Sequence, residues 1–72
     1  MQLETIIKTI KARRESLKVT QETLATLSGV GLRTLKQFER GKGNPTFMTL
    51  QKIGDALGLE ISISIKKQAT NL

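Results

Sequence analysis

The chain has 72 residues with no cysteine and no histidine, which excludes disulfides, thiolate metal sites and histidine-based catalysis. A chain this short allows one domain, stabilised by apolar packing or by a partner subunit. Twelve Lys and Arg residues against six Asp and Glu residues give a net charge of +6, which favours a polyanion: nucleic acid first, an anionic membrane surface second.

The first predicted element is a helix over residues 2–18. Apolar residues recur there at helical spacing: Leu3, Ile6, Ile7, Ile10 and Leu17. No apolar run approaches the roughly 18 residues that a membrane helix needs. The charges of Glu4 and Lys8 argue against a signal peptide. We therefore expect a cytoplasmic, nucleoid-associated protein.

A second, shorter helix is predicted over residues 21–27. Thr20 is a suitable N-cap, and Glu22 lies in the first turn, where the helix dipole favours an anion. Leu24, Ala25 and Leu27 form one apolar stripe. The helix should end at Ser28-Gly29, because Gly can adopt the left-handed conformation of a tight turn.

The third predicted helix follows this turn directly. Leu35 and Phe38 are three residues apart and should face the core, with Val30 as an anchor before the helix. The other face is polar: Arg33, Thr34, Lys36, Gln37 and Arg40. Two short helices joined by a turn containing Gly have the geometry of a helix-turn-helix, whose second helix can enter the major groove of DNA.

The remaining elements are a fourth helix and a strand. Thr46 caps the fourth helix after a loop containing Pro45, and Gly58 ends it. Residues 59–66 alternate between apolar and polar side chains, which predicts a β-strand with one apolar face. Residues 67–72 show no pattern and are expected to form a flexible tail.

The chain resembles the Cro/phage-repressor (Xre-like) helix-turn-helix family through several landmarks in order. These are Thr20-Gln21-Glu22-Thr23-Leu24-Ala25, Ser28-Gly29-Val30, Leu35, Phe38-Glu39-Arg40-Gly41-Lys42, Asn44-Pro45-Thr46, Leu50 and Ala56-Leu57-Gly58. The resemblance covers residues 6–59. It implies a mostly α fold, with a four-helix, lambda-repressor-like DNA-binding domain over residues 1–58.

The resemblance also implies roles for individual residues. The expected base contacts are Leu32, Arg33, Lys36 and Gln37. The expected phosphate contacts are Gln21, Thr34, Arg40, Lys42 and Asn44. Arg14 and Glu39 match a structural ion pair of the family. Two departures stand out: Gly31 has no side chain to cap the third helix, and Leu32 cannot hydrogen-bond a base but can contact a thymine methyl group.

The predicted strand suggests how two copies associate. A single strand leaves its backbone groups unpaired, and the same strand of a second copy, across a two-fold axis, is the simplest partner. We expect a homodimer in which residues 59–66 form the dimerisation strand and Ile61, Ile63 and Ile65 lie at the interface. Dimerisation through a C-terminal strand is similar to the arrangement of HipB-type antitoxin regulators. A strand that pairs with a partner protein, or a disordered tail, is the alternative.

Together these features predict a regulator that binds double-stranded DNA. We expect it to bind a palindromic operator as a homodimer and to repress transcription. The alternative is an antitoxin that mainly binds a toxin protein, with operon autoregulation secondary. An enzyme is not expected, because the carboxylates are scattered and no histidine activates a hydroxyl. RNA binding lacks a stacking platform, since two Phe are the only aromatic residues. We expect no cofactor, metal ion, small-molecule ligand or membrane partner.

Overall fold

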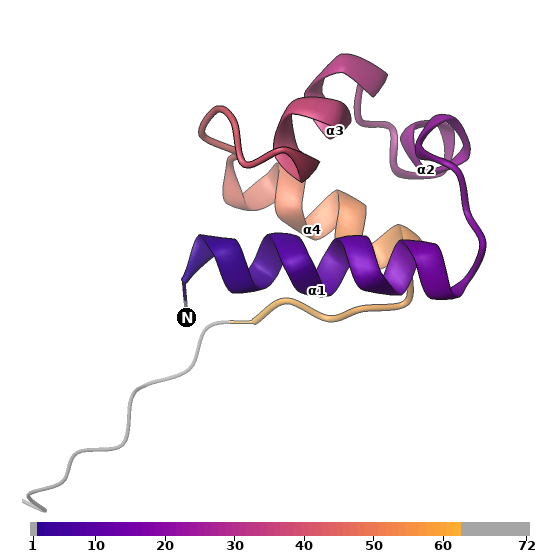
Figure 1. The fold of residues 1–72 in the computed structure, drawn as a ribbon, viewed down its shortest axis with the longest axis horizontal. Helices are drawn as coiled ribbons and strands as arrows, with labels where there is room; N and C mark the ends of the chain where they lie inside the picture. Colours follow the sequence, from indigo (N-terminus) through magenta and orange to yellow (C-terminus); the bar gives the residue numbers. More distant parts are fainter. Residues whose placement is uncertain (1, 63–72) are drawn as a thin grey trace, which may run out of the picture.

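The computed structural model describes residues 2–62, and this part of the chain folds into four helices (Figure 1). α1 spans Leu3–Ser16, α2 spans Gln21–Ser28, α3 spans Leu32–Glu39 and α4 spans Phe47–Ala56. α2 packs against α3 and α4, and α1 packs against α3. The predicted mostly α, four-helix arrangement is confirmed. None of the helices described here has the length and apolar character that a membrane crossing requires.

Each of the four helices contributes buried apolar side chains to the core. Its buried side chains are Ile10, Leu24, Val30, Leu35, Phe38, Leu50, Ile53 and Leu57. The predicted core positions of the third helix, Leu35 and Phe38, are almost fully inaccessible to solvent. Leu27 differs from the prediction, because its side chain is 62% exposed although it was expected to share the stripe of α2.

α1 ends two residues before the predicted end, at Ser16. The backbone N–H of Lys18 donates to the carbonyl of Glu15, and that of Val19 donates to the carbonyl of Arg14. These bonds form a Schellman motif, which requires a left-handed residue just after the helix. That residue is Lys18, with φ of 58°.

α2 and α4 begin with the threonine caps expected from the sequence. The side-chain oxygen of Thr20 accepts a hydrogen bond from the backbone N–H of Thr23 at 3.0 Å. Thr46 does the same for the N–H of Thr49, also at 3.0 Å. The N-cap of α3 is Gly31, which provides no side-chain hydrogen bond.

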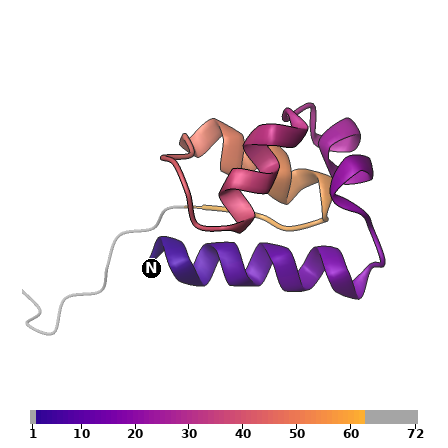
Figure 2. The same ribbon diagram turned by 45° about the horizontal axis from the view of Figure 1, so that its top comes forward.

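After α4 the chain turns at Gly58 and runs back along α1 in the opposite direction (Figures 1 and 2). The side chain of Ile61 lies against α4, where an ideal Cβ at Gly54 would be 3.1 Å from its Cδ1 atom. The absence of a side chain at Gly54 therefore allows this close approach.

The predicted strand over 59–66 is only partly within the described residues. Residues 59–62 have no regular secondary structure, and no strand is present within residues 2–62. A β-strand needs a neighbour to pair with, and residues 2–62 of one copy provide none for this segment. Ile63 and Ile65 lie outside the described residues.

Candidate nucleic-acid interface

α2, a three-residue turn and α3 form the helix-turn-helix unit predicted from the sequence. Gly29 ends α2 in the left-handed conformation, with φ of 74°, and its N–H donates to the carbonyl of Ala25. Val30 is buried in the core within the turn. The backbone reverses here because Gly29 allows the left-handed turn and Val30 fixes it to the core.

α3 has an apolar inner face and a polar outer face. Leu35 and Phe38 lie in the core, so the residues between them point outward. Arg33 and Lys36 are exposed, and Leu32 and Gln37 are half-buried. The helix therefore presents these four residues together on its outer side.

These four residues line a shallow depression, which we call the α3 hollow. Its volume is about 430 Å³. Its lining residues are Leu32, Arg33, Lys36, Gln37 and Arg40. The structure thus brings all four predicted base-contacting residues together. It adds Arg40, which the sequence placed with the phosphate contacts.

The chemistry of the α3 hollow matches the edges of DNA bases. Arg33 offers a planar fork of N–H donors, and Gln37 offers both a donor and an acceptor. An arginine can bond the two acceptors of guanine in the major groove, and a glutamine can bond adenine in the same way. Leu32 supplies the apolar surface that a thymine methyl group would contact.

The predicted phosphate contacts are spread over the helix-turn-helix unit and the loop that follows it. Gln21 is the first residue of α2. Thr34 is exposed on α3, and Lys42 and Asn44 are exposed in the loop that follows it. Gln21 differs from the others, because its Nε2 atom already donates a hydrogen bond to Oε1 of Glu39 at 3.1 Å.

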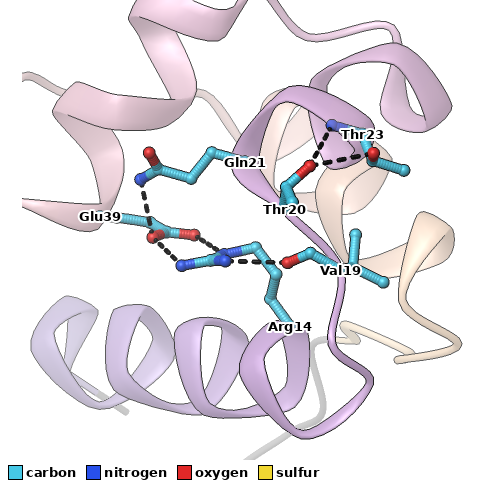
Figure 3. Close-up of polar contacts among 6 residues, drawn as sticks. All are labelled: Arg14, Val19, Thr20, Gln21, Thr23 and Glu39. Carbon is cyan, nitrogen blue, oxygen red and sulfur yellow. Dashed lines mark hydrogen bonds and ion pairs between the residues drawn. The ribbon is translucent and has the colours of Figure 1, made fainter.

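Glu39 belongs to a buried ion pair with Arg14, which joins α1 to α3 (Figure 3). Arg14 Nε donates to Oε2 of Glu39 at 2.7 Å, and Nη2 donates to Oε1 at 2.9 Å. The side chains are only 12% and 2% exposed. The hydrogen bonds to Glu39 raise the pKa of Arg14 above its ordinary value, against the opposite effect of burial. The guanidinium therefore remains charged.

Two polar contacts that were not predicted connect residues far apart in the sequence. One is the bond from Gln21 to Glu39, which joins residues 18 positions apart. The other involves Arg13, whose Nε donates to the carbonyl of Leu57 at 3.0 Å. Neither has a local sequence signal, since each joins separate helices.

A comparison with protein families gives a match over this part of the sequence. A family model described as helix-turn-helix matches residues 10–63, which include the whole unit described above. The chain belongs to this helix-turn-helix family. The predicted membership of its Cro/phage-repressor (Xre-like) group is confirmed. The HipB-type branch stays a prediction.

Several relatives within the helix-turn-helix family have curated names. The transcriptional repressor RstR of the cryptic phage CTXphi, from Vibrio cholerae, is 36% identical over 59 residues, which cover 82% of this chain and 53% of that protein. The immunity repressor of Bacillus phage phi105 is 33% identical over 64 residues, or 89% of this chain and 44% of that protein. An uncharacterised transcriptional regulator of the helix-turn-helix type from Haemophilus influenzae is 38% identical over 58 residues, covering 81% of this chain and 59% of that protein. The chain spans about half the length of the curated relatives it matches.

Proposed function

We propose that this chain binds double-stranded DNA sequence-specifically and regulates transcription. The main observation is the α3 hollow, in which the exposed side of one short helix gathers the donors of Arg33, Lys36 and Gln37. An α-helix fits the major groove, where each base pair presents a distinct pattern of donors and acceptors. The polar face of α3 suits that groove, because α2 and the apolar core hold the helix in place from its other side.

The individual contacts follow from the chemistry of each side chain. Arg33 bonds guanine and Gln37 bonds adenine, while Lys36 contacts a base and Leu32 contacts a thymine methyl group. Around them, the phosphate contacts fix the position of the protein on the duplex. These are Gln21, Thr34, Arg40, Lys42 and Asn44.

Repression is the regulatory effect we propose. Two of the relatives are named as repressors, and the net charge of +6 suits a DNA ligand. A protein that occupies a promoter excludes polymerase by its volume alone. This mechanism needs no further domain.

We further propose that the chain binds as a homodimer to a palindromic operator. Two-fold symmetric helix-turn-helix proteins contact half-sites about 34–36 Å apart, one helical turn of DNA. The alternation over residues 59–66 supports strand pairing between two copies, with Ile61, Ile63 and Ile65 on the apolar face. In that arrangement the apolar face also packs on the helices, as Ile61 does on Gly54 in one copy.

The dimer has a direct test in the variant Ile63→Asp. A buried charge in an apolar interface is costly, so the variant should sediment as a monomer where the parent chain sediments as a dimer. Ser62→Asp is the matched control, because it adds the same charge to the opposite face of the alternating segment. An unchanged dimer in the Ile63 variant would remove the strand from the interface.

The antitoxin role stays an alternative prediction. It requires a surface of this chain that binds a toxin protein. A gene for a kinase-like toxin beside the gene for this chain would favour it.

Selection of duplexes from a random pool tests the function itself. We expect the selected fragments to share a palindrome, with half-sites one helical turn apart and guanine and adenine among the specified bases. The affinity of the purified protein for the selected duplex is then measured by fluorescence anisotropy, with a shuffled duplex as control. Selection of no common sequence would contradict specific DNA binding.

A further inference from the structure

We infer that Glu39 positions the side-chain amide of Gln21 for a DNA phosphate. The inference rests on the proposed function, in which Gln21 is a phosphate contact. It assigns to Glu39 a role beyond its ion pair with Arg14: Glu39 is a positioning residue that acts through Gln21.

The hydrogen bond from Gln21 decides which way its amide faces. A carboxylate can only accept hydrogen bonds, so the nitrogen of the amide, and not its oxygen, must face Glu39. The structure has this orientation, with Nε2 at 3.1 Å from Oε1 of Glu39 and the amide oxygen turned away (Figure 3). The bond uses one of the two N–H groups of the amide. The second N–H remains available to a phosphate oxygen, which can likewise only accept.

Glu39 is itself rigidly held, so it can hold Gln21 in turn. Arg14 donates two hydrogen bonds to its carboxylate, at 2.7 and 2.9 Å. The same guanidinium donates through Nη1 to the carbonyl of Val19 at 2.9 Å. Val19 immediately precedes the cap of α2, Thr20. The carboxylate of Glu39 is therefore fixed relative to α1, to α3 and to the start of α2.

This arrangement has two consequences for DNA binding. A glutamine side chain loses conformational entropy when it is ordered, and a side chain ordered beforehand loses less on binding. In addition, a carboxylate near a phosphate would repel it, and the positive charge of Arg14 offsets this repulsion. Gln21 can thus bridge a buried carboxylate and a DNA phosphate.

The first test measures the order of side-chain amides in the free protein by ¹⁵N relaxation. The control is Gln51, which is exposed on α4 and has no side-chain hydrogen bond among the contacts of residues 2–62. We expect the amide of Gln21 to be ordered on the nanosecond timescale and that of Gln51 to be mobile. Equal mobility of the two amides would overturn the proposal, whether or not DNA binds.

The second test replaces single phosphates of the selected operator by uncharged methylphosphonates. At one phosphate the parent chain should lose affinity about tenfold to 150-fold, the range expected for one hydrogen bond to a charged group. Gln21→Ala should show a similar loss on the unmodified operator and no further loss at that phosphate. Parent-like affinity of Gln21→Ala would overturn the proposal, while the selected operator would still establish DNA binding.

A folded variant without Glu39 completes this test. Glu39→Met alone leaves the charge of Arg14 buried and unpaired, which can unfold the domain. The double variant Arg14→Met/Glu39→Met replaces both charges by apolar groups of similar volume, which proteins often tolerate. Helical content by circular dichroism checks its fold. We expect the double variant to lose most of the effect of the methylphosphonate. A full effect in this folded variant would show that Gln21 needs no positioning by Glu39.

Discussion

Arg33 is the residue whose loss should change sequence discrimination most directly. It is exposed on the outer face of α3, in the α3 hollow. One arginine bonded to both acceptors of a guanine contributes about 1–3 kcal/mol of discrimination against other bases. We therefore expect Arg33→Ala to reduce the difference in binding free energy between operator and shuffled duplex by about this amount. Fluorescence anisotropy on the two duplexes measures it.

The control for Arg33 is Lys52→Ala. Lys52 is exposed on α4, and its removal lowers the net charge of the protein by the same single unit. It should leave discrimination unchanged. If Arg33→Ala instead weakens binding to both duplexes equally, Arg33 is a phosphate contact and not a base contact.

Arg14 should contribute more to folding stability than any exposed cation of the chain. Its partner Glu39 is almost fully buried, so the variant Arg14→Met leaves a carboxylate without its counter-ion in the protein interior. Removing one partner of a buried pair typically costs about 3–5 kcal/mol. We expect urea unfolding of Arg14→Met to show a loss of this size in the free energy of unfolding.

The second ion pair of the described residues provides the comparison. Lys8 Nζ lies 3.1 Å from Oε1 of Glu4, one turn apart on α1, and both side chains are more than two-thirds exposed. Such surface pairs contribute about 0.3–0.5 kcal/mol. Lys8→Ala should therefore change stability little. Equal losses in Lys8→Ala and Arg14→Met would contradict the importance of burial.

At the level of the elements, the C-terminal end of α1 has an unfavourable backbone conformation. The left-handed position of the Schellman motif is occupied by Lys18, with φ of 58°, whereas glycines occupy the left-handed positions after α2, α3 and α4. A non-glycine residue is strained there by contact of its Cβ with the backbone. We expect Lys18→Gly to raise the free energy of unfolding by about 0.5–1 kcal/mol, measured by urea unfolding.

The same substitution within α1 should have the opposite sign. Lys11 is exposed in the interior of this helix, where glycine is about 1 kcal/mol less favourable than a good helix former. Lys11→Gly should therefore destabilise the domain. A loss of stability in both variants would show that the left-handed conformation of Lys18 is not strained.

How well each element could be predicted depends on whether its signal is local. The caps at Thr20 and Thr46 and the glycine after α2 act on neighbouring residues, so the sequence alone locates these helix ends. The end of α1 was misplaced, because its Schellman motif has a lysine where a glycine is typical. The four predicted base contacts could be grouped because they share one helix.

The contacts between elements could not be predicted in the same way. The bond from Gln21 to Glu39 depends on how α2 and α3 pack, and neither residue has a distinctive neighbour in sequence. The family resemblance supplied the Arg14–Glu39 pair, but composition and spacing did not. The exposure of Leu27 likewise follows from packing. An apolar stripe on a short helix does not define how many of its residues the other helices cover.

For the whole molecule, the salt dependence of binding links charge to the number of subunits. The logarithm of the affinity falls with the logarithm of the salt concentration by about 0.9 for each phosphate that a cation neutralises. Lys42 lies exposed in the loop after α3 and is a proposed phosphate contact. The variant Lys42→Gln removes one such cation from each subunit while keeping a polar side chain of similar length.

The change in slope therefore counts the subunits on the operator. A homodimer loses two contacts in Lys42→Gln, so its slope should become shallower by about 1.8, whereas a monomer would show about 0.9. Titrations at several salt concentrations measure both slopes, with Lys52→Gln as the control for a cation outside the interface. An unchanged slope in Lys42→Gln would remove this loop from the DNA contacts, and a change near 0.9 would contradict the dimer.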